Sequence, residues 1–207
     1  ILEKEKKNPS KEFQSLLEKL FPICRSITGN GVVDTLKIIR DIIPINLLKY
    51  KSGTKVYDWV IPDEWNIKAA WIKDSKGEKL IDFKNNNLHV ISYSLPLKKK
   101  IKWDELKNHL TFDNLNKDSI PYVTSYYDPQ WGFCCSENQY REIKKKKDDI
   151  FEVFIDSDRK SGLMHGGELI IPGKSKKEIL ISTYICHPSM ANDNLSGVVL
   201  TTFLARL

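Results

Sequence analysis

Apolar residues recur at helical spacing in two stretches near the start of the chain. Ser10 can cap the first predicted helix, and Pro22 follows its end. The second predicted helix spans residues 31–43, with Pro44 beyond it and a glycine-rich turn before it. The inward residues of the two helices are Phe13, Leu16, Leu17, Leu20, Val32, Leu36, Ile39 and Ile43. These spacings predict two amphipathic helices that pack on later elements.

The pattern changes to short alternating stretches after the second helix. The alternation predicts strands at residues 56–60, 67–72, 78–83 and 88–94, and a short helix follows at 104–109. We interpret residues 47–109 as a small inserted β-rich domain. Three tryptophans within it are expected to fill its core.

Beyond this stretch, strands and helices alternate again. Strands are predicted at 122–126 and 151–155, a helix at 137–147 and a hairpin-like segment at 168–171. An apolar, β-branched run at 178–185 predicts a buried strand that is central in its sheet, and a helix begins near Val198. The fold class is therefore α/β, with a mixed sheet flanked by helices.

A histidine and an aspartate lie where that last strand is expected to end. His187 and Asp193 stand between the strand and the next helix, the position at which ligands bind in open α/β sheets. Imidazole nitrogen and carboxylate oxygen are both zinc donors, and one carboxylate can bridge two metals. Asn194 or Ser196 can cap the helix. The alternative is that His187 and Asp193 only hydrogen-bond within the turn.

The full string favours the metal-ligand interpretation. Residues 193–197 spell Asp-Asn-Leu-Ser-Gly and enter a helix, with His187 shortly upstream. This arrangement resembles the co-catalytic zinc aminopeptidases typified by secreted Aeromonas and Streptomyces enzymes. In that family the histidine binds one zinc ion and the aspartate bridges two. The resemblance implies that His187 and Asp193 are ligands of one or two zinc ions.

The longer string at residues 186–197 is similar to a bacterial branch of that family, whose members have an aminopeptidase-like domain and an inserted β domain. Other phrases of the branch lie at residues 26–31, 52–59, 62–67, 131–134, 155–157 and 170–173. The resemblance implies an aminopeptidase-like α/β domain formed by residues 1–46 and 110–207. It also implies that the chain holds only the N-terminal part of the fold.

Two departures from the family pattern bear on function. The family carries an aspartate two residues after the histidine, which orients the imidazole, whereas this chain has Ser189. The family's remaining ligands and its general-base glutamate follow the Asp-Asn-x-Ser-Gly string, so we expect them beyond Leu207.

Composition narrows the class of protein. Of the 207 residues, 41% are hydrophobic, which suffices for a packed core, and no apolar run is long enough to cross a bilayer. The four cysteines match no disulfide or zinc-ribbon spacing, which favours reduced thiols and a cytoplasmic location. The net charge of +6 is concentrated in lysine runs at 98–100 and 144–147. Such runs without interleaved aromatics are typical of solvated surface and do not favour nucleic-acid binding.

Other residues are weaker candidates for a catalytic or metal site. Cys186 beside His187 suggests a cysteine hydrolase, but sequence neighbours on a strand point to opposite faces. His165 and Glu168 have the His-x-x-Glu spacing of some zinc carboxypeptidases, in a glycine-containing turn. His89 and His109 have no partner at useful spacing. Asp156 and Asp158 follow a predicted strand, where they are expected to cap it or to line the cleft.

The sequence thus favours a zinc-dependent aminopeptidase-like hydrolase that acts on peptides. The alternative is a non-catalytic protein with a partial metal site that acts in binding or in assembly related to polysaccharide biosynthesis. Association into a homo-oligomer stays open.

Overall fold

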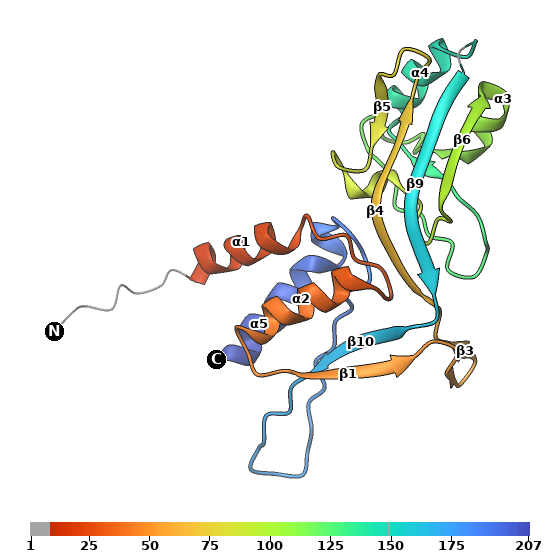
Figure 1. Ribbon diagram of the computed structural model, residues 1–207. Helices are drawn as coiled ribbons and strands as arrows, with labels where there is room; N and C mark the ends of the chain where they lie inside the picture. The colour runs from red at the N-terminus through yellow and green to blue at the C-terminus, as the bar shows by residue number, and fades with distance from the viewer. Residues whose placement is uncertain (1–8, 149) are drawn as a thin grey trace. The chain divides into compact units, whose positions relative to one another are not determined.

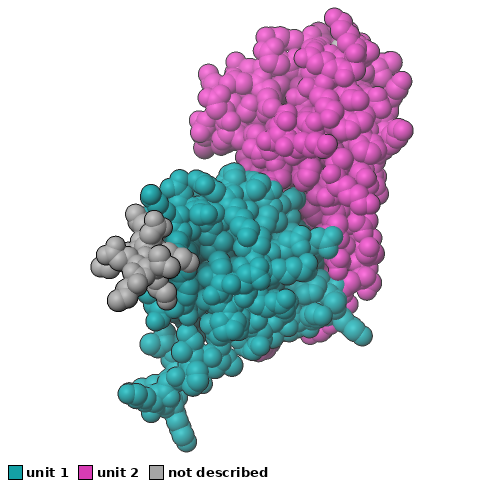
Figure 2. Space-filling view, turned by 60° about the vertical axis from the view of Figure 1, so that its left-hand side comes forward, with its two compact units in different colours: residues 1–51, 163–207 teal, residues 52–162 magenta. Residues whose placement is uncertain are grey.

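The computed structural model describes residues 9–148 and 150–207. Its contacts divide the chain into two compact units (Figure 2). Unit 1 contains the residues up to Lys51 and those from Leu163 onward, and unit 2 contains Ser52–Gly162. Both units combine helices with small sheets, so the predicted α/β class is confirmed at this level.

The described residues of unit 1 form three α-helices, one π-helical turn and a two-stranded sheet (Figure 1). The helices are α1 (Pro9–Leu20), α2 (Asn30–Arg40) and α5 (Ser196–Arg206). Their apolar faces meet in one core, because residues three and four apart share a helix face. The core residues are Leu16, Leu20, Val32, Leu36, Ile39, Ile43, Ile45, Leu195, Val198 and Val199.

Aromatic and charged contacts join the first and last helices of unit 1. The rings of Phe13 on α1 and Phe203 on α5 have centroids 5.9 Å apart, and Arg206 pairs with Glu12 at 2.5 Å. Below the helices, β1 (Asn46–Lys51) pairs antiparallel with β10 (Leu163–Glu168). Segments that are distant in the sequence therefore pack and pair with each other in unit 1.

Unit 2 is built on a four-stranded antiparallel sheet in the order β5-β4-β9-β6. The strands are β4 (Glu64–Lys73), β5 (Lys79–Asp82), β6 (Leu97–Lys102) and β9 (Ile150–Lys160). Alternate residues of β9 from Phe151 to Ser157 are buried, as the period of two in a strand requires. Helices α3 (Trp103–Leu106) and α4 (Glu137–Lys145) supply further residues to the unit 2 core.

Short elements complete unit 2. They are β2 (Lys55–Val56), β3 (Trp59–Val60), β7 (Leu110–Thr111), β8 (Phe133–Cys134) and the 3-10 helices η1 (Asn87–His89) and η2 (Lys107–His109). β2 pairs with β3, and β7 pairs with β8 in parallel.

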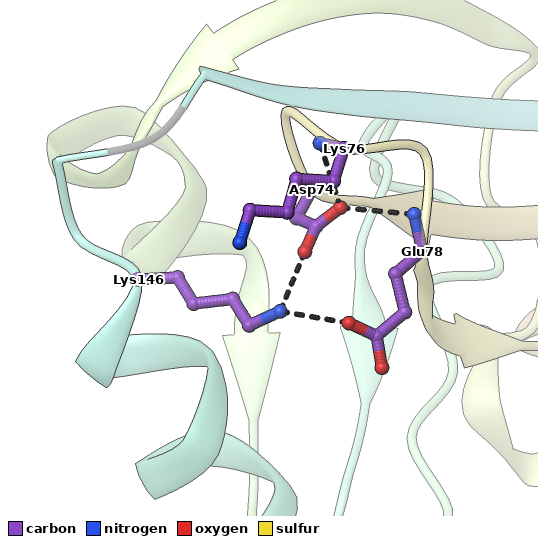
Figure 3. A network of polar contacts seen from close by, with 4 residues as sticks. All are labelled: Asp74, Lys76, Glu78 and Lys146. Atoms are coloured by element: carbon purple, nitrogen blue, oxygen red, sulfur yellow. Dashed lines mark hydrogen bonds and ion pairs between the residues drawn. The ribbon is translucent and has the colours of Figure 1, made fainter.

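Asp74 organises the turn between β4 and β5 (Figure 3). One carboxylate oxygen accepts hydrogen bonds from the backbone amides of Lys76 at 3.0 Å and Glu78 at 2.9 Å. The other accepts from the Lys146 ammonium at 2.5 Å, and Lys146 also pairs with Glu78 at 3.0 Å. The hydrogen bond from Lys146 and the two amides lower the pKa of Asp74. This network ties the turn to the end of α4.

Several predicted elements are confirmed and several are wrong. The two N-terminal helices and the strands at 67–72, 78–83 and 151–155 are present, with small shifts at their ends. The predicted strand at 56–60 is instead a hairpin, because Tyr57 adopts a positive φ of 54° in its middle. The predicted strands at 88–94 and 122–126 contribute only isolated bridges.

The largest error is the central strand predicted at 178–185. This segment forms no strand, and Ile179 and Leu180 are 92% and 89% exposed. A strand needs neighbours for its backbone hydrogen bonds, and no strand in the described residues pairs with this segment. The β-branched residues therefore show a preference for strand conformation, but this preference does not supply a strand to pair with.

The observed division also differs from the predicted insertion at 47–109. Unit 2 takes in residues 110–162 as well, because β9 pairs with both β4 and β6 in the same sheet. Strand β9, which the sequence analysis placed in the aminopeptidase-like α/β domain, is thus a central strand of unit 2.

Candidate functional site

The candidate site lies in unit 1, in the loop that joins β10 to α5 (Figure 1). His187 follows the exposed segment at 178–185, and Asp193 lies in the single turn η3 (Ala191–Leu195) that precedes α5. Leu195, two residues after Asp193 and only 1% exposed, enters the unit 1 core. The core thereby fixes one end of the loop.

Tyr184 contacts both predicted ligands. Its hydroxyl donates a hydrogen bond to Oδ1 of Asp193, and its ring lies edge-on to the His187 ring with centroids 5.4 Å apart. The hydrogen bond to Asp193 raises the pKa of Tyr184, so the phenol stays protonated and keeps donating. His187 and Asp193 are therefore held near each other by one side chain.

Burial lowers the pKa of the His187 imidazole, although the nearby charge of Asp193 acts in the opposite direction. The ring is therefore neutral at pH 7. A neutral imidazole is the form that binds metals.

The Asn194 side chain ties the loop back to the preceding segment. Its amide nitrogen donates to the Thr183 hydroxyl at 2.5 Å and to the Tyr184 carbonyl at 3.0 Å. A Cβ at position 197 would lie 2.2 Å from Asn194 Oδ1, so only glycine leaves room for this side chain. These contacts explain why Asn and Gly accompany Asp193 in the string.

The predicted helix caps are wrong. α5 has no side-chain cap among the described residues. Asn194 instead makes the contacts with Thr183 and Tyr184, and the Ser196 hydroxyl donates to the Asn192 carbonyl at 3.2 Å. Both side chains stabilise the loop rather than the helix end.

Ser189 occupies the position where the resembled family has an aspartate. Its hydroxyl donates to the carbonyl of Phe21, just after α1, at 3.3 Å. The carbonyl of His187 accepts a hydrogen bond from Nε of Arg25 at 2.9 Å. This part of the loop is thus connected to the segment between α1 and α2.

Sequence reasoning missed Tyr184 and Arg25. Tyr184 stood within the predicted strand, where an aromatic residue is ordinary. Arg25 offered one weak signal, a charged residue directly after Ile23 and Cys24. Their contacts join positions 9 and 162 residues apart, and no local pattern encodes the second.

The donors suit zinc in kind but are few in number. A catalytic zinc ion usually takes three protein ligands, and the described residues contain no group of three or more His, Cys, Asp or Glu side chains that could hold a metal. His187 and Asp193 can thus supply part of a metal site.

A cysteine-histidine pair is present but poorly suited to nucleophilic chemistry. Sγ of Cys186 lies 3.4 Å from Nδ1 of His187. Burial raises the pKa of the Cys186 thiol, which disfavours the reactive thiolate. The cysteine-hydrolase alternative gains no support from this environment.

The remaining histidines have other settings. His165 and Glu168 lie three residues apart on β10, and residues at odd spacing on a strand project to opposite faces, so they do not converge on one ion. In unit 2, Nδ1 of His89 lies 2.8 Å from the Cys134 carbonyl, and the His109 ring stacks on Trp131 at 3.7 Å. Both contacts are structural.

Two predicted cleft residues, Asp156 and Asp158, lie on β9 of unit 2. Asp158 pairs with Lys160 at 2.9 Å. Neither belongs to the loop that carries His187.

The chain is similar in structure to a solved protein described as a "putative peptidase" from Clostridium acetobutylicum, with a TM-score of 0.91 and 56% identity. By its fold, it is therefore an α/β protein similar to that peptidase-like structure. Residues 14–207 match the family described as "Domain of unknown function (DUF4910)", and the chain belongs to that family.

A curated relative from Clostridium acetobutylicum is 56% identical over 195 residues and is called "Putative polysaccharide biosynthesis protein with aminopeptidase-like domain". That match covers 94% of this chain but 44% of the relative, and the solved peptidase-like structure is covered to 46%. The chain thus spans less than half of these relatives. An aminopeptidase from Aneurinibacillus sp. strain AM-1 aligns with a TM-score of 0.36 and 11% identity over 95% of this chain and 58% of that one, too low to support an argument.

No helix in the described residues is long and apolar enough to span a bilayer.

Proposed function

We propose that this chain forms part of a zinc-dependent aminopeptidase-like hydrolase that removes N-terminal residues from peptides. The observation that carries the proposal is the contact of Tyr184 with both His187 and Asp193. Two donors of the right chemistry are held together in a loop before a helix, with the imidazole neutral at pH 7.

Each residue has a separate role in this proposal. His187 donates a ring nitrogen to one ion. Asp193 uses Oδ1 to accept the Tyr184 hydrogen bond and has its second oxygen for a metal. When bound, zinc lowers the pKa of a coordinated water and polarises the scissile carbonyl. The remaining ligands and the glutamate base come, in this proposal, from outside the described residues.

Hydrolysis by the intact protein tests this proposal. With zinc present, it should release the N-terminal residue from short peptides, and chelation should abolish the release. Asp193→Ala should lose both bound metal and activity, whereas His165→Ala should retain both. Tight metal binding without cleavage across a broad peptide panel would contradict the peptidase assignment.

That outcome would favour the second candidate, a non-catalytic aminopeptidase-like protein that acts in binding or in assembly related to polysaccharide biosynthesis. One observation favours this candidate: the curated Clostridium relative is named for polysaccharide biosynthesis.

A further inference from the structure

Arg25 is buried between two segments that are far apart in the sequence. It is 2% exposed, and it follows α1 in the connector, which we define as residues 21–29. Nη1 donates to the carbonyl of Leu20 at 2.6 Å, and Nε donates to the carbonyl of His187 at 2.9 Å. One rigid guanidinium therefore links the end of α1 to the backbone of a predicted metal ligand.

The connector is itself held firmly in place. A Cβ at Gly31 would lie 1.9 Å from the Cys24 carbonyl oxygen, so the start of α2 packs directly against the connector backbone. Ser189 adds a second link to the same region through the Phe21 carbonyl. The loop residues on either side of Pro188 are thus both attached to one fixed support.

The charge of Arg25 is not neutralised by a carboxylate. Among residues 9–148 and 150–207, no Asp or Glu lies within ion-pair distance of its guanidinium. Burial lowers the pKa of Arg25 to about 10, so it remains charged at pH 7. The neighbouring thiol of Cys24 has its pKa raised to about 12 by burial and stays neutral.

Burying a cation without a counter-ion costs free energy, and its hydrogen bonds to carbonyls offset only part of that cost. A neutral side chain could fill the same space with less penalty. The arrangement therefore favours a role in which the two directed hydrogen bonds matter more than the stability that burial provides.

We propose that Arg25 is a positioning residue for His187, which fixes the His187 backbone and thereby the direction of its ring toward the metal. The proposal rests on the proposed metal site. It differs from a purely structural role in one measurable respect, since a structural residue changes the fraction folded but not the zinc affinity of the folded molecules.

The test compares Arg25→Gln, Arg25→Lys and the control Arg206→Gln in the intact protein. Arg206 is also in unit 1 and also contacts α1, through Glu12, but it lies on α5 away from the loop. Zinc affinity is measured at a temperature at which each variant is fully folded by near-UV circular dichroism. Arg25→Gln should weaken zinc binding about 10- to 100-fold, the usual effect of losing a residue that orients a ligand.

Arg25→Lys should restore part of that loss, because it keeps the charge and one donor but not the planar fork. Arg206→Gln should bind zinc as the wild type does. Equal affinity of folded Arg25→Gln and wild type would overturn the proposal. If Arg25→Gln does not fold, Arg25→Lys decides: wild-type affinity in that variant would also overturn it, and a measurable loss would support it.

A metal-free readout separates this proposal from the metal site itself. The Leu195 amide, which donates to the Met190 carbonyl at 3.2 Å, should exchange about tenfold faster in Arg25→Lys or Arg25→Gln, while the α2 amides of Leu36 and Ile39 keep their rates. If no form of the protein binds zinc, the proposed function fails, and this exchange pattern still reports whether Arg25 holds the loop. Unchanged exchange of the Leu195 amide would show that it does not.

Discussion

Two loops in this molecule are organised by a buried charged side chain, and they differ in whether the charge is neutralised. In the β4–β5 turn of unit 2, the Asp74 carboxylate accepts from two amides and pairs with Lys146 (Figure 3). The second is the site loop of unit 1, residues 169–195 between β10 and α5. Arg25 in the connector donates to the carbonyls of Leu20 and of His187 in this loop, and it has no carboxylate partner among the described residues.

This difference separates structure from candidate function. A compensated charge such as Asp74 closes a turn and needs no further explanation. An uncompensated charge that contacts the backbone of a potential metal ligand is harder to account for by stability alone. We infer that the unbalanced electrostatics mark the site loop as the functional one.

The largest effect is expected from the apolar residue Leu195, at the end of the site loop. The Asp74–Glu78 turn contains no apolar side chain, whereas the site loop ends in buried Leu195. Leu195→Ala should destabilise the protein by about 2–5 kcal/mol, because it removes packed methyl groups and leaves a cavity. Urea unfolding measures the loss, and amide exchange should place it in unit 1.

Leu115→Ala is the matched control, because Leu115 is 96% exposed. It should change stability by less than about 0.5 kcal/mol. A similarly small effect of Leu195→Ala would mean that core packing does not hold the site loop.

A smaller effect is expected from the hydroxyl that touches Asp193. Tyr184→Phe removes the donor to Asp193 but keeps the ring beside His187, so zinc affinity should fall about tenfold with little change in melting temperature. Calorimetric titration with zinc measures this. Tyr127→Phe removes a hydroxyl that donates to the Val60 carbonyl in unit 2 and should leave zinc binding unchanged. Equal affinities in the two variants would argue against a positioning role for Tyr184.

The smallest predicted effect concerns acid stability of the Asp74 turn. The pKa of Asp74 is lower in the fold than in the unfolded chain, where it is about 4. Its stabilising contribution is therefore present above about pH 4 and is lost as the pH falls through the lower folded value. Thermal unfolding at pH 6 and pH 3 should show a smaller difference in Asp74→Asn than in the wild type.

Asp34→Asn, at an exposed position of α2, serves as its control and should retain the wild-type difference. If Asp74→Asn loses as much stability on acidification as the wild type, the turn is not held by the Asp74 charge.

Local patterns predicted the elements in which the buried residues recur with the period of a helix or of a strand. The α2 helix follows from Val32, Leu36 and Ile39 on one face, and β9 follows from the alternation that begins at Phe151. The segment at 178–185 failed because its strand propensity finds no pairing strand in the described residues. The boundaries of unit 2 could not be predicted from local patterns, because they depend on the pairing of β9 with β4 and β6.

The candidate site shows the same limit. His187 and Asp193 could be proposed from the string that contains them, and their role as ligands stays a prediction. The supports could not be proposed, because Arg25 reaches the His187 carbonyl across 162 residues and Ser189 reaches Phe21 across 168. Contacts of this kind depend on the packing of α1 against α5 and leave no periodic trace in the sequence.

Zinc titration of the intact wild-type protein, His187→Ala, Asp193→Ala and the control His165→Ala tests the central claim most directly. The account predicts that the wild type and His165→Ala bind one or two zinc ions with equal affinity, and that His187→Ala and Asp193→Ala each bind at least about 100-fold more weakly, since both remove a direct ligand. Zinc binding that is absent from the wild type, or that survives unchanged in both ligand variants, would contradict it.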